Sequence, residues 1–206
     1  LKLFEVCRMR RIPILTFINK MDRDGKDPLE LLDEIESTLS LTPVPMNWPV
    51  GSGPWFQGVY DFEENQVLRF ERTEHGRKPA PITVSGLDDP DLPKHIGEAP
   101  CNDLREQAEL LSVAGASFDR ERFLDGEVTP VFFGSALNNF GVEPFLDALL
   151  RLAPAPGDRK AGDGSIAATS PDFTGYIFKI QANMDPRHRD RVAFMRVVSG
   201  RFERDM

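Results

Sequence analysis

The chain has 206 residues, of which 40% are hydrophobic and 28% are charged, and its formal net charge at pH 7 is −8. This length allows one large domain or two modest ones, and the composition is ordinary for a globular protein. The negative charge argues against a chain that only coats nucleic acid, so no DNA partner is expected. No apolar run approaches the roughly 20 residues needed to span a bilayer, so no membrane partner is expected either.

The two cysteines, Cys7 and Cys101, lie far apart and have no His or Cys at the spacing of a metal site. Isolated, reduced thiols in a cytoplasmic protein are the simplest interpretation. The first residues, LKLFEVCRMRR, mix charged and apolar positions and contain no signal-peptide core. The chain has no initiator Met, begins inside a predicted helix and stops without a terminating signal. We therefore expect a fragment cut at both ends.

The first 41 residues predict one α/β unit. Residues 12–18, IPILTFI, form a continuous apolar run, which is typical of a strand buried on both faces of a parallel sheet. A helix is predicted to begin at the N-cap Asp27, with Pro28 in its first turn and Glu30 three residues after the cap. Its apolar stripe continues to about Ser40. A strand, a polar loop and a helix in this order form an α/β unit.

The next stretch has a different character. Residues 42–53, TPVPMNWPVGSG, contain too much Pro and Gly for a helix. Residues 56–62 and 67–71 flank the polar tetrapeptide EENQ and predict a hairpin. Residues 81–86, PITVSG, predict another short strand.

Two helices are predicted before the α/β pattern resumes. Residues 87–93, LDDPDLP, predict a loop, and helices are expected at about residues 102–114 and 118–126. Trp48 and Trp55 are predicted to pack in the core of this part of the chain, with a role in partner binding as the alternative.

The α/β pattern returns at EVTPVFFGSALNNFG. Residues 128–133 are apolar and predict a strand, and the small polar residues 134–136 follow where that strand should end. Residues 142–150 carry the apolar spacing of an amphipathic helix that ends before Pro154.

The last part of the chain predicts a second domain. Residues 153–165 have the composition of a linker. Residues 173–182 and 191–200 predict two antiparallel strands that open an all-β domain. The predicted segments are 1–41, the first part of the α/β domain; 42–126, an inserted subdomain; 127–153, the end of the α/β domain; 154–171, a linker; and 172–206, the start of the β domain.

A basic stretch covers the predicted hairpin of the second domain. Residues 187–204 hold six arginines against Asp190 and Glu203, a local charge of 6 − 2 = +4. His188 and its neighbouring arginines are candidates for binding the phosphate groups of RNA, and a solvated hairpin loop is an equally good interpretation.

Two predicted strands deliver polar residues at their carboxyl ends. Asn19, Lys20 and Asp22 follow the first strand, and Ser135 and Ala136 follow the second. Ligands of open α/β sheets bind outside the carboxyl ends of the strands, so we expect these two loops to form one site.

The chemistry of this predicted site matches guanine. The adjacent N1–H and N2–H₂ donors of the base fit the two oxygens of Asp22. The N7 and O6 acceptors suit the Asn19 amide and a backbone N–H of Ser135 or Ala136, and the methylene stem of Lys20 can cover the ring. Adenine would leave Asp22 unpaired, and such polar pairs discriminate by roughly 10⁴-fold.

The alternative interpretation is an ordinary polar strand end. With equal residue usage, Asn-Lys-x-Asp occurs by chance in about one chain in forty of this length, so the motif is of moderate specificity by itself. The preceding strand, together with a second strand that ends in Gly-Ser-Ala, favours the base-reading interpretation.

At these residues the sequence resembles the translational GTPases. Their guanine-specificity motifs, Asn-Lys-x-Asp and Ser-Ala, occur here as INKMD at 18–22 and GSA at 134–136. The resemblance covers essentially the whole chain, and FTGYIFKIQANMDPRHRDRVAFMRVVSG is its most specific segment. That segment resembles the members that act in translation termination. The resemblance implies part of a P-loop GTPase G domain with an α+β insertion at 42–126, followed by the start of a β-barrel domain at 172–206.

The sequence departs from the family in one large respect. A complete member carries GxxxxGK[ST], a switch threonine and DxxG before Asn-Lys-x-Asp, whereas only 18 residues precede Asn19 and contain none of these. DRDG (22–25) and DFTG (172–175) match DxxG by letters, but both follow the base-reading motif and are attributed to chance. We therefore expect a G domain that lacks its N-terminal phosphate-binding half, with no catalytic residue and no metal ligand in this chain.

For the intact protein, the resemblance implies a ribosome-dependent GTPase that dislodges the stop-codon-decoding release factors. It implies GTP or GDP with Mg²⁺ as ligands, ribosomal RNA and proteins and the peptide chain release factors as partners, and a cytoplasmic location. The chain by itself is expected to bind no nucleotide and to be inactive. Two alternatives remain: a ribosome- or protein-binding module without nucleotide binding, and a fragment of an elongation factor G-like GTPase.

Overall fold

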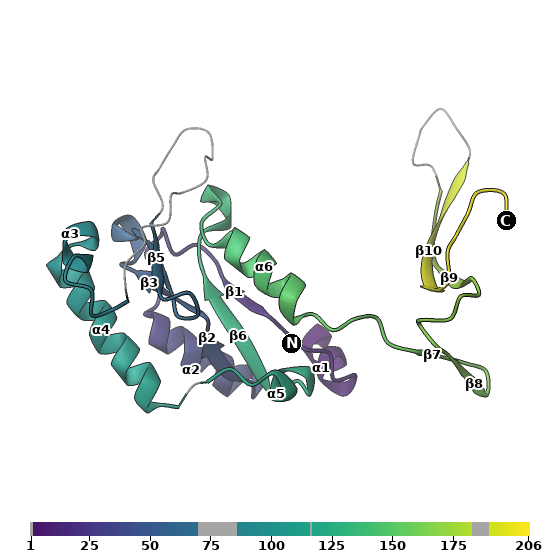
Figure 1. Ribbon diagram of the computed structural model, residues 1–206, viewed down its shortest axis with the longest axis horizontal. Coiled ribbons are helices and arrows are strands. Elements are labelled where there is room, and N and C mark those ends of the chain that lie inside the picture. Colours follow the sequence, from purple (N-terminus) through teal and green to yellow (C-terminus); the bar gives the residue numbers. More distant parts are fainter. Residues whose placement is uncertain (1, 70–85, 116, 183–189) are drawn as a thin grey trace. The chain divides into compact units, whose positions relative to one another are not determined.

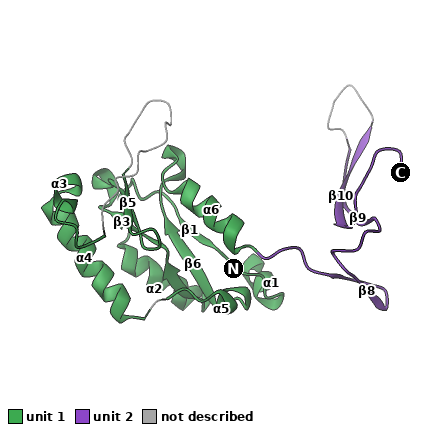
Figure 2. Cartoon of the chain, in the orientation of Figure 1, with its two compact units in different colours: residues 1–153 green, residues 154–206 purple. Residues whose placement is uncertain are grey.

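The structure is a computed structural model that describes residues 2–69, 86–115, 117–182 and 190–206 (Figure 1). The chain divides into two compact units, residues 1–153 and 154–206 (Figure 2). The boundary between the units coincides with the start of the predicted linker. Among the described residues, no helix is long and apolar enough to cross a membrane.

The first unit combines helices with parallel and antiparallel strands. Its described elements, in chain order, are α1 (Lys2–Met9), β1 (Thr16–Ile18), α2 (Pro28–Leu39), β2 (Thr42–Pro45), β3 (Asn47–Val50), η1 (Gly53–Trp55), β4 (Gly58–Asp61), β5 (Gln66–Arg69), α3 (Leu92–Ile96), α4 (Glu98–Val113), α5 (Arg120–Leu124), β6 (Val128–Phe133), η2 (Ala136–Asn138) and α6 (Val142–Leu152).

A parallel sheet in the order β1-β6-β2 forms the centre of this unit. Every residue of β6 is buried, because the strand has a neighbour on each side and packed layers on both faces. Phe132 packs edge-on against Phe145 of α6, with ring centroids 5.6 Å apart, and Phe133 packs against Trp48 at 5.2 Å. Alternate residues of β6 therefore enter two separate hydrophobic clusters.

β1 is shorter and less buried than the sequence predicts. Its parallel sense is as predicted, but only Thr16–Ile18 form the strand, and all three residues are half-buried. Two causes are visible in the described part of the chain. Pro13 has no N–H to donate to a ladder, and β1 pairs with a single neighbour, β6. The prediction of a strand buried on both faces is therefore wrong for this edge position.

β2 lies within the range predicted for the inserted subdomain, yet it is the third strand of the parallel sheet. After β2 the chain forms an antiparallel sheet in the order β3-β4-β5. The hairpin of β4 and β5 around EENQ is confirmed. Of the strand predicted at residues 81–86, only Gly86 lies within the described residues.

The predicted helices are present, with one addition. The Asp27 side chain accepts a hydrogen bond of 2.8 Å from the N–H of Leu29 and caps α2 as predicted. α4 begins at Glu98, before the predicted start, and α3 occupies part of the predicted loop. α3 forms there because Leu92 and Ile96 are both buried in the core, which compensates for a sequence with weak helix signals.

The two tryptophans have opposite environments. Trp48 is fully buried, and its Nε1–H donates to Gln107 Oε1 of α4 at 2.6 Å. Trp55 is 80% exposed, so the prediction that it packs in the core is wrong. Trp55 lies in the short turn η1 between β3 and β4, where no strand face directs its side chain inward.

The second unit consists of two antiparallel hairpins. Its described elements are β7 (Arg159–Ala161), β8 (Gly164–Ile166), β9 (Thr174–Ala182) and β10 (Arg191–Ser199). The pairing of β9 with β10 is confirmed. β7 pairs with β8 within the predicted linker, a hairpin that the sequence did not predict; its turn includes Gly162 at φ +58°. Arg187, His188 and Arg189 lie outside the described residues.

Candidate functional site

The carboxyl ends of β1 and β6 lie side by side, because the two strands are parallel neighbours. The N–H of Gly134 donates to the carbonyl of Ile18 at 3.0 Å, and the N–H of Met21 donates to the carbonyl of Gly134 at 3.1 Å. These backbone bonds extend the strand pairing into the two loops. The loops predicted to form one site are therefore in direct contact.

The Asn19 side chain joins the two loops. Its Oδ1 accepts the N–H of Lys20 at 2.8 Å and the N–H of Ala136 at 2.9 Å, the second across 117 residues of sequence. Lys20 has φ +72°, a left-handed conformation that is uncommon for a residue with a side chain. Because the amide oxygen is committed to these two donors, the Asn19 NH₂ group is the part that can donate to a ligand.

Asp22 belongs to a network of three polar side chains. Its Oδ2 accepts from Asn138 Nδ2 at 2.9 Å, and the same Nδ2 donates to Ser135 Oγ at 3.1 Å. The Ser135 hydroxyl bond is the main cause that holds the pKa of Asp22 below its usual range. The backbone N–H of Asp22, the Asn138 amide and the charge of Arg23 act in the same direction, while partial burial opposes them. Asp22 is therefore a carboxylate at neutral pH.

Gly134 is required by the close approach of the loops. A Cβ at this position would lie 2.2 Å from the carbonyl oxygen of Phe140 and 2.8 Å from Cζ of Phe17. Phe140 approaches so closely because it pairs with Ser135: Ser135 N–H donates to Phe140 O at 2.9 Å, and Phe140 N–H donates to Ser135 O at 2.8 Å. This pairing closes the turn that carries Ala136.

The structure brings all five predicted site residues to one edge of the parallel sheet. Asn19, Lys20 and Ala136 are exposed, Asp22 is half-buried, and Ser135 is buried. One detail of the sequence prediction is not met. The N–H groups of Ser135 and Ala136 donate to Phe140 O and Asn19 Oδ1, so in this arrangement neither is free to read the O6 atom of a base.

Sequence reasoning missed Asn138. It lies two residues after Ala136, within the quoted segment GSALNNFG, but nothing in the sequence separates it from its neighbour Asn139. The fold makes the distinction, because Asn138 ends η2 and contacts Asp22, while Asn139 follows in a left-handed conformation with φ +62°.

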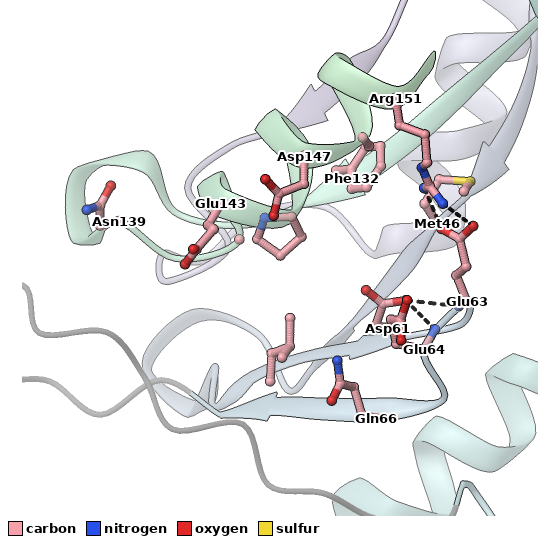
Figure 3. A pocket seen from close by; sticks show the side chains of 14 residues that line it. Met46, Asp61, Glu63, Glu64, Gln66, Phe132, Asn139, Glu143, Asp147 and Arg151 are labelled. Carbon is pink, nitrogen blue, oxygen red and sulfur yellow. Dashed lines mark hydrogen bonds and ion pairs between the residues drawn. The ribbon is translucent and has the colours of Figure 1, made fainter.

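A concavity of about 540 Å³ lies between the β4–β5 hairpin and α6 (Figure 3). None of the five predicted site residues lines it. Its lining is acidic and includes Asp61, Glu64, Glu143 and Asp147. Arg151 of α6 forms a bidentate ion pair with Glu63 of the hairpin and so links the two walls of the cleft.

The Glu63–Arg151 pair predicts a pH-dependent contribution to stability. The Arg151 guanidinium holds the pKa of Glu63 below its usual value. The contribution is therefore present above the ordinary glutamate pKa of 4.5 and is lost as the pH falls through the lower pKa of the folded state. Both side chains are about half exposed, so Arg151→Ala should destabilise the chain by less than about 1 kcal/mol at pH 7.

Urea denaturation between pH 2 and pH 7 measures this contribution, in a double-mutant cycle with Glu63→Gln. The difference between the wild-type chain and Arg151→Ala should be largest near neutrality and should close in acid. A difference that is constant over the whole range would mean that Arg151 acts through packing alone.

The described residues offer no obvious metal site. Both cysteines are free thiols, with Cys101 buried and Cys7 half-buried. In the described part of the chain, no three or more His, Cys, Asp or Glu side chains are grouped so that they could hold a metal ion.

Comparison with known proteins identifies the family. Residues 1–155 match the model of the elongation factor Tu GTP binding domain. The chain belongs to this family. Residues 172–206, which lie in the second unit, match the model of elongation factor G domain 2. As the resemblance implied, the chain combines an α/β GTP-binding domain with the beginning of a second domain.

The curated relatives of this chain are longer proteins. The chain is 56% identical over 205 residues to peptide chain release factor 3 of Trichodesmium erythraeum (strain IMS101) and to that of Gloeobacter violaceus (strain ATCC 29082 / PCC 7421). It is 54% identical over 206 residues to the protein of the same name from Symbiobacterium thermophilum (strain DSM 24528 / JCM 14929 / IAM 14863 / T). Each match covers 100% of this chain and 38–39% of the relative.

Proposed function

We propose that this chain is the base-reading part of a ribosome-dependent GTPase of translation termination, one that recycles the stop-codon-decoding release factors. The observation that carries the proposal is the hydrogen bond from the Ala136 N–H to Asn19 Oδ1. It holds the Asn-Lys-x-Asp loop and the Ser-Ala loop together at the carboxyl edge of a parallel sheet, where α/β proteins bind ligands. The family match and the name shared by the relatives support the same proposal.

In the proposed complex, Asp22 accepts hydrogen bonds from N1–H and N2–H₂ of guanine. The low pKa of Asp22 favours this assignment, because a carboxylate has only acceptors. The amide oxygen of Asn19 already accepts two backbone N–H groups, so its NH₂ group faces the N7 and O6 acceptors. The exposed Lys20 lays its methylene stem over the ring, and Ser135 and Ala136 close the site.

The phosphate chemistry is assigned to a part of the protein outside this chain. The sequence contains no GxxxxGK[ST] loop, and the chain spans about 38% of the length of its relatives. We propose that a preceding segment supplies the phosphate-binding half of the G domain, including the groups that hold Mg²⁺ and orient the attacking water. In that arrangement, residues 42–126 include a subdomain inserted between the two base-reading loops. The contribution of this chain is the choice of base.

The proposed partners of the intact protein are the ribosome and the peptide chain release factors, in the cytoplasm. A recycling assay tests this. The intact protein with GTP should accelerate dissociation of a stop-codon-decoding release factor from ribosomes after peptide release. A protein that instead accelerated translocation in the same system, and left the release factor bound, would belong with the elongation factor G-like alternative. The match of residues 172–206 to elongation factor G domain 2 keeps that alternative in the experiment.

The chain by itself has a second candidate function, as a module that binds ribosome or protein without nucleotide. This alternative is favoured by the absence of a phosphate-binding loop, since phosphate contacts supply much of the affinity of a GTPase for its nucleotide. We expect isothermal titration calorimetry to detect no GTP binding by the 206-residue chain at micromolar concentrations. A tight, Mg²⁺-dependent complex would show that the chain contains a complete nucleotide site.

A further inference from the structure

Asn138 contacts two of the five residues proposed to read the base. Its Nδ2 donates to Asp22 Oδ2 at 2.9 Å and to Ser135 Oγ at 3.1 Å. The turn η2 places it there, because the Asn138 N–H bonds back to the carbonyl of Ser135 at 3.2 Å. The contact with Asp22 joins residues 116 positions apart, and thus connects the loop after β6 to the loop after β1.

We propose that Asn138 is a positioning residue that fixes the Asp22 carboxylate for the N1–H and N2–H₂ donors of guanine. Through Asp22 it would set the preference for guanine over purines that lack the 2-amino group. This inference rests on the proposed function, because it assigns a role within the same base-reading site.

The donor and acceptor groups of the three side chains account for this role. An amide NH₂ has two hydrogens, and Asn138 directs one to Asp22 and the other to Ser135. The Ser135 hydroxyl accepts from Asn138, and the same hydroxyl is the main cause that lowers the pKa of Asp22. Asn138 thus connects the three side chains, and its bond to Asp22 holds the carboxylate in one orientation. A carboxylate has about four lone-pair positions, so these side-chain contacts leave acceptor positions for a ligand.

The location of Asn138 separates this role from core packing. Asn138 is exposed, whereas Ser135, to which its side chain donates, is 1% exposed. Within the described residues, the hydrogen bonds of the Asn138 side chain go to Asp22 and Ser135. Removing the Asn138 amide should therefore alter base recognition more than it alters folding.

The affinities of the intact protein for GDP and for inosine diphosphate test the proposal, since inosine diphosphate lacks the 2-amino group. Asn138→Ala should weaken GDP binding about tenfold, the loss expected for one hydrogen bond to a charged group, and should change inosine diphosphate binding less. Asn138→Asp keeps the shape, removes both donors and places a second negative charge beside Asp22, so its effect should be at least as large. Asn102→Ala, at an exposed asparagine of α4, is the matched control.

The outcomes distinguish this inference from the proposed function. If both Asn138 variants keep the wild-type preference for GDP over inosine diphosphate within twofold, the inference is overturned. It is also overturned if Asn138→Ala changes this preference and Asn138→Asp does not. If the wild-type protein itself does not prefer GDP over ADP, the proposed function fails instead. Thermal midpoints of all variants accompany the titrations, and the expected result is a changed GDP preference in proteins that melt like the wild type.

Discussion

Asp22→Asn in the intact protein is expected to lose GTP binding by roughly 10⁴-fold and to gain binding of xanthosine triphosphate. Asp22 is proposed to accept from two adjacent donors of guanine. An asparagine offers one acceptor and one donor, so its NH₂ group would face N2–H₂ as donor against donor. Xanthine carries a carbonyl in place of the 2-amino group and restores a donor–acceptor pair. The expected result is therefore a reversal of base preference and not a general loss of nucleotide binding.

Competition binding with GTP, xanthosine triphosphate and ATP measures this reversal. Asp24→Asn is the matched control, because Asp24 is an exposed carboxylate two residues further along the same loop. It should retain the wild-type preference for GTP. Full preference for GTP in the Asp22→Asn protein would remove Asp22 from the base site. Loss of GTP binding without any gain of xanthosine triphosphate binding would instead mean that Asp22 supports the fold of the loop.

The Asp22 variant also has a consequence inside the protein. In the wild-type chain, Asn138 Nδ2 donates to the Asp22 carboxylate, and the Ser135 hydroxyl is the main cause that lowers the pKa of this carboxylate. An asparagine at position 22 retains one acceptor oxygen for them, so the loop can keep its conformation while the ligand-facing chemistry changes. This is why a switch in base preference is expected and not a collapsed site.

Elements whose signals are local could be predicted from the sequence. Asp27 and Pro28 begin α2 because a side-chain cap and a fixed φ both act within one turn. The residues of β6 form a buried strand because a largely apolar run, with Thr129 as its one polar residue, has few other stable environments. The two loops of the proposed base site could be placed together because the carboxyl ends of parallel strands share an edge.

The predictions failed where tertiary contacts decide the outcome. Leu92 and Ile96 form α3 inside a Pro- and Asp-rich stretch because the core accepts both side chains. Trp55 is exposed, although its large and mostly apolar side chain predicts burial. Asn138 and Asn139 carry the same side chain one residue apart, and only the path of the turn directs Asn138 to Asp22. The contact of Asn138 with Asp22 joins residues 116 positions apart, and no local sequence pattern reports it.

Asn47 provides the clearest connection between the fold and the proposed site. It is 1% exposed, and its side chain bonds both backbone groups of Phe133: Phe133 N–H donates to Asn47 Oδ1 at 2.7 Å, and Asn47 Nδ2 donates to Phe133 O at 3.3 Å. The pairing of β2 with β6 ends at Pro45 and Val131, so the Asn47 side chain takes the place of a strand partner for the end of β6. Gly134 follows immediately and makes the first contact between the two loops.

Asn47→Ala is therefore expected to destabilise the 206-residue chain by about 3 kcal/mol, because a buried N–H and a buried carbonyl each lose their partner. Urea denaturation followed by tryptophan fluorescence measures this loss, and Trp48, buried next to Phe133, serves as the reporter. The exposed Asn102→Ala should change the free energy of unfolding by no more than about 0.5 kcal/mol. A loss below about 1 kcal/mol for Asn47→Ala would show that the end of β6, and with it the loop that carries Ser135 and Ala136, does not depend on this side chain.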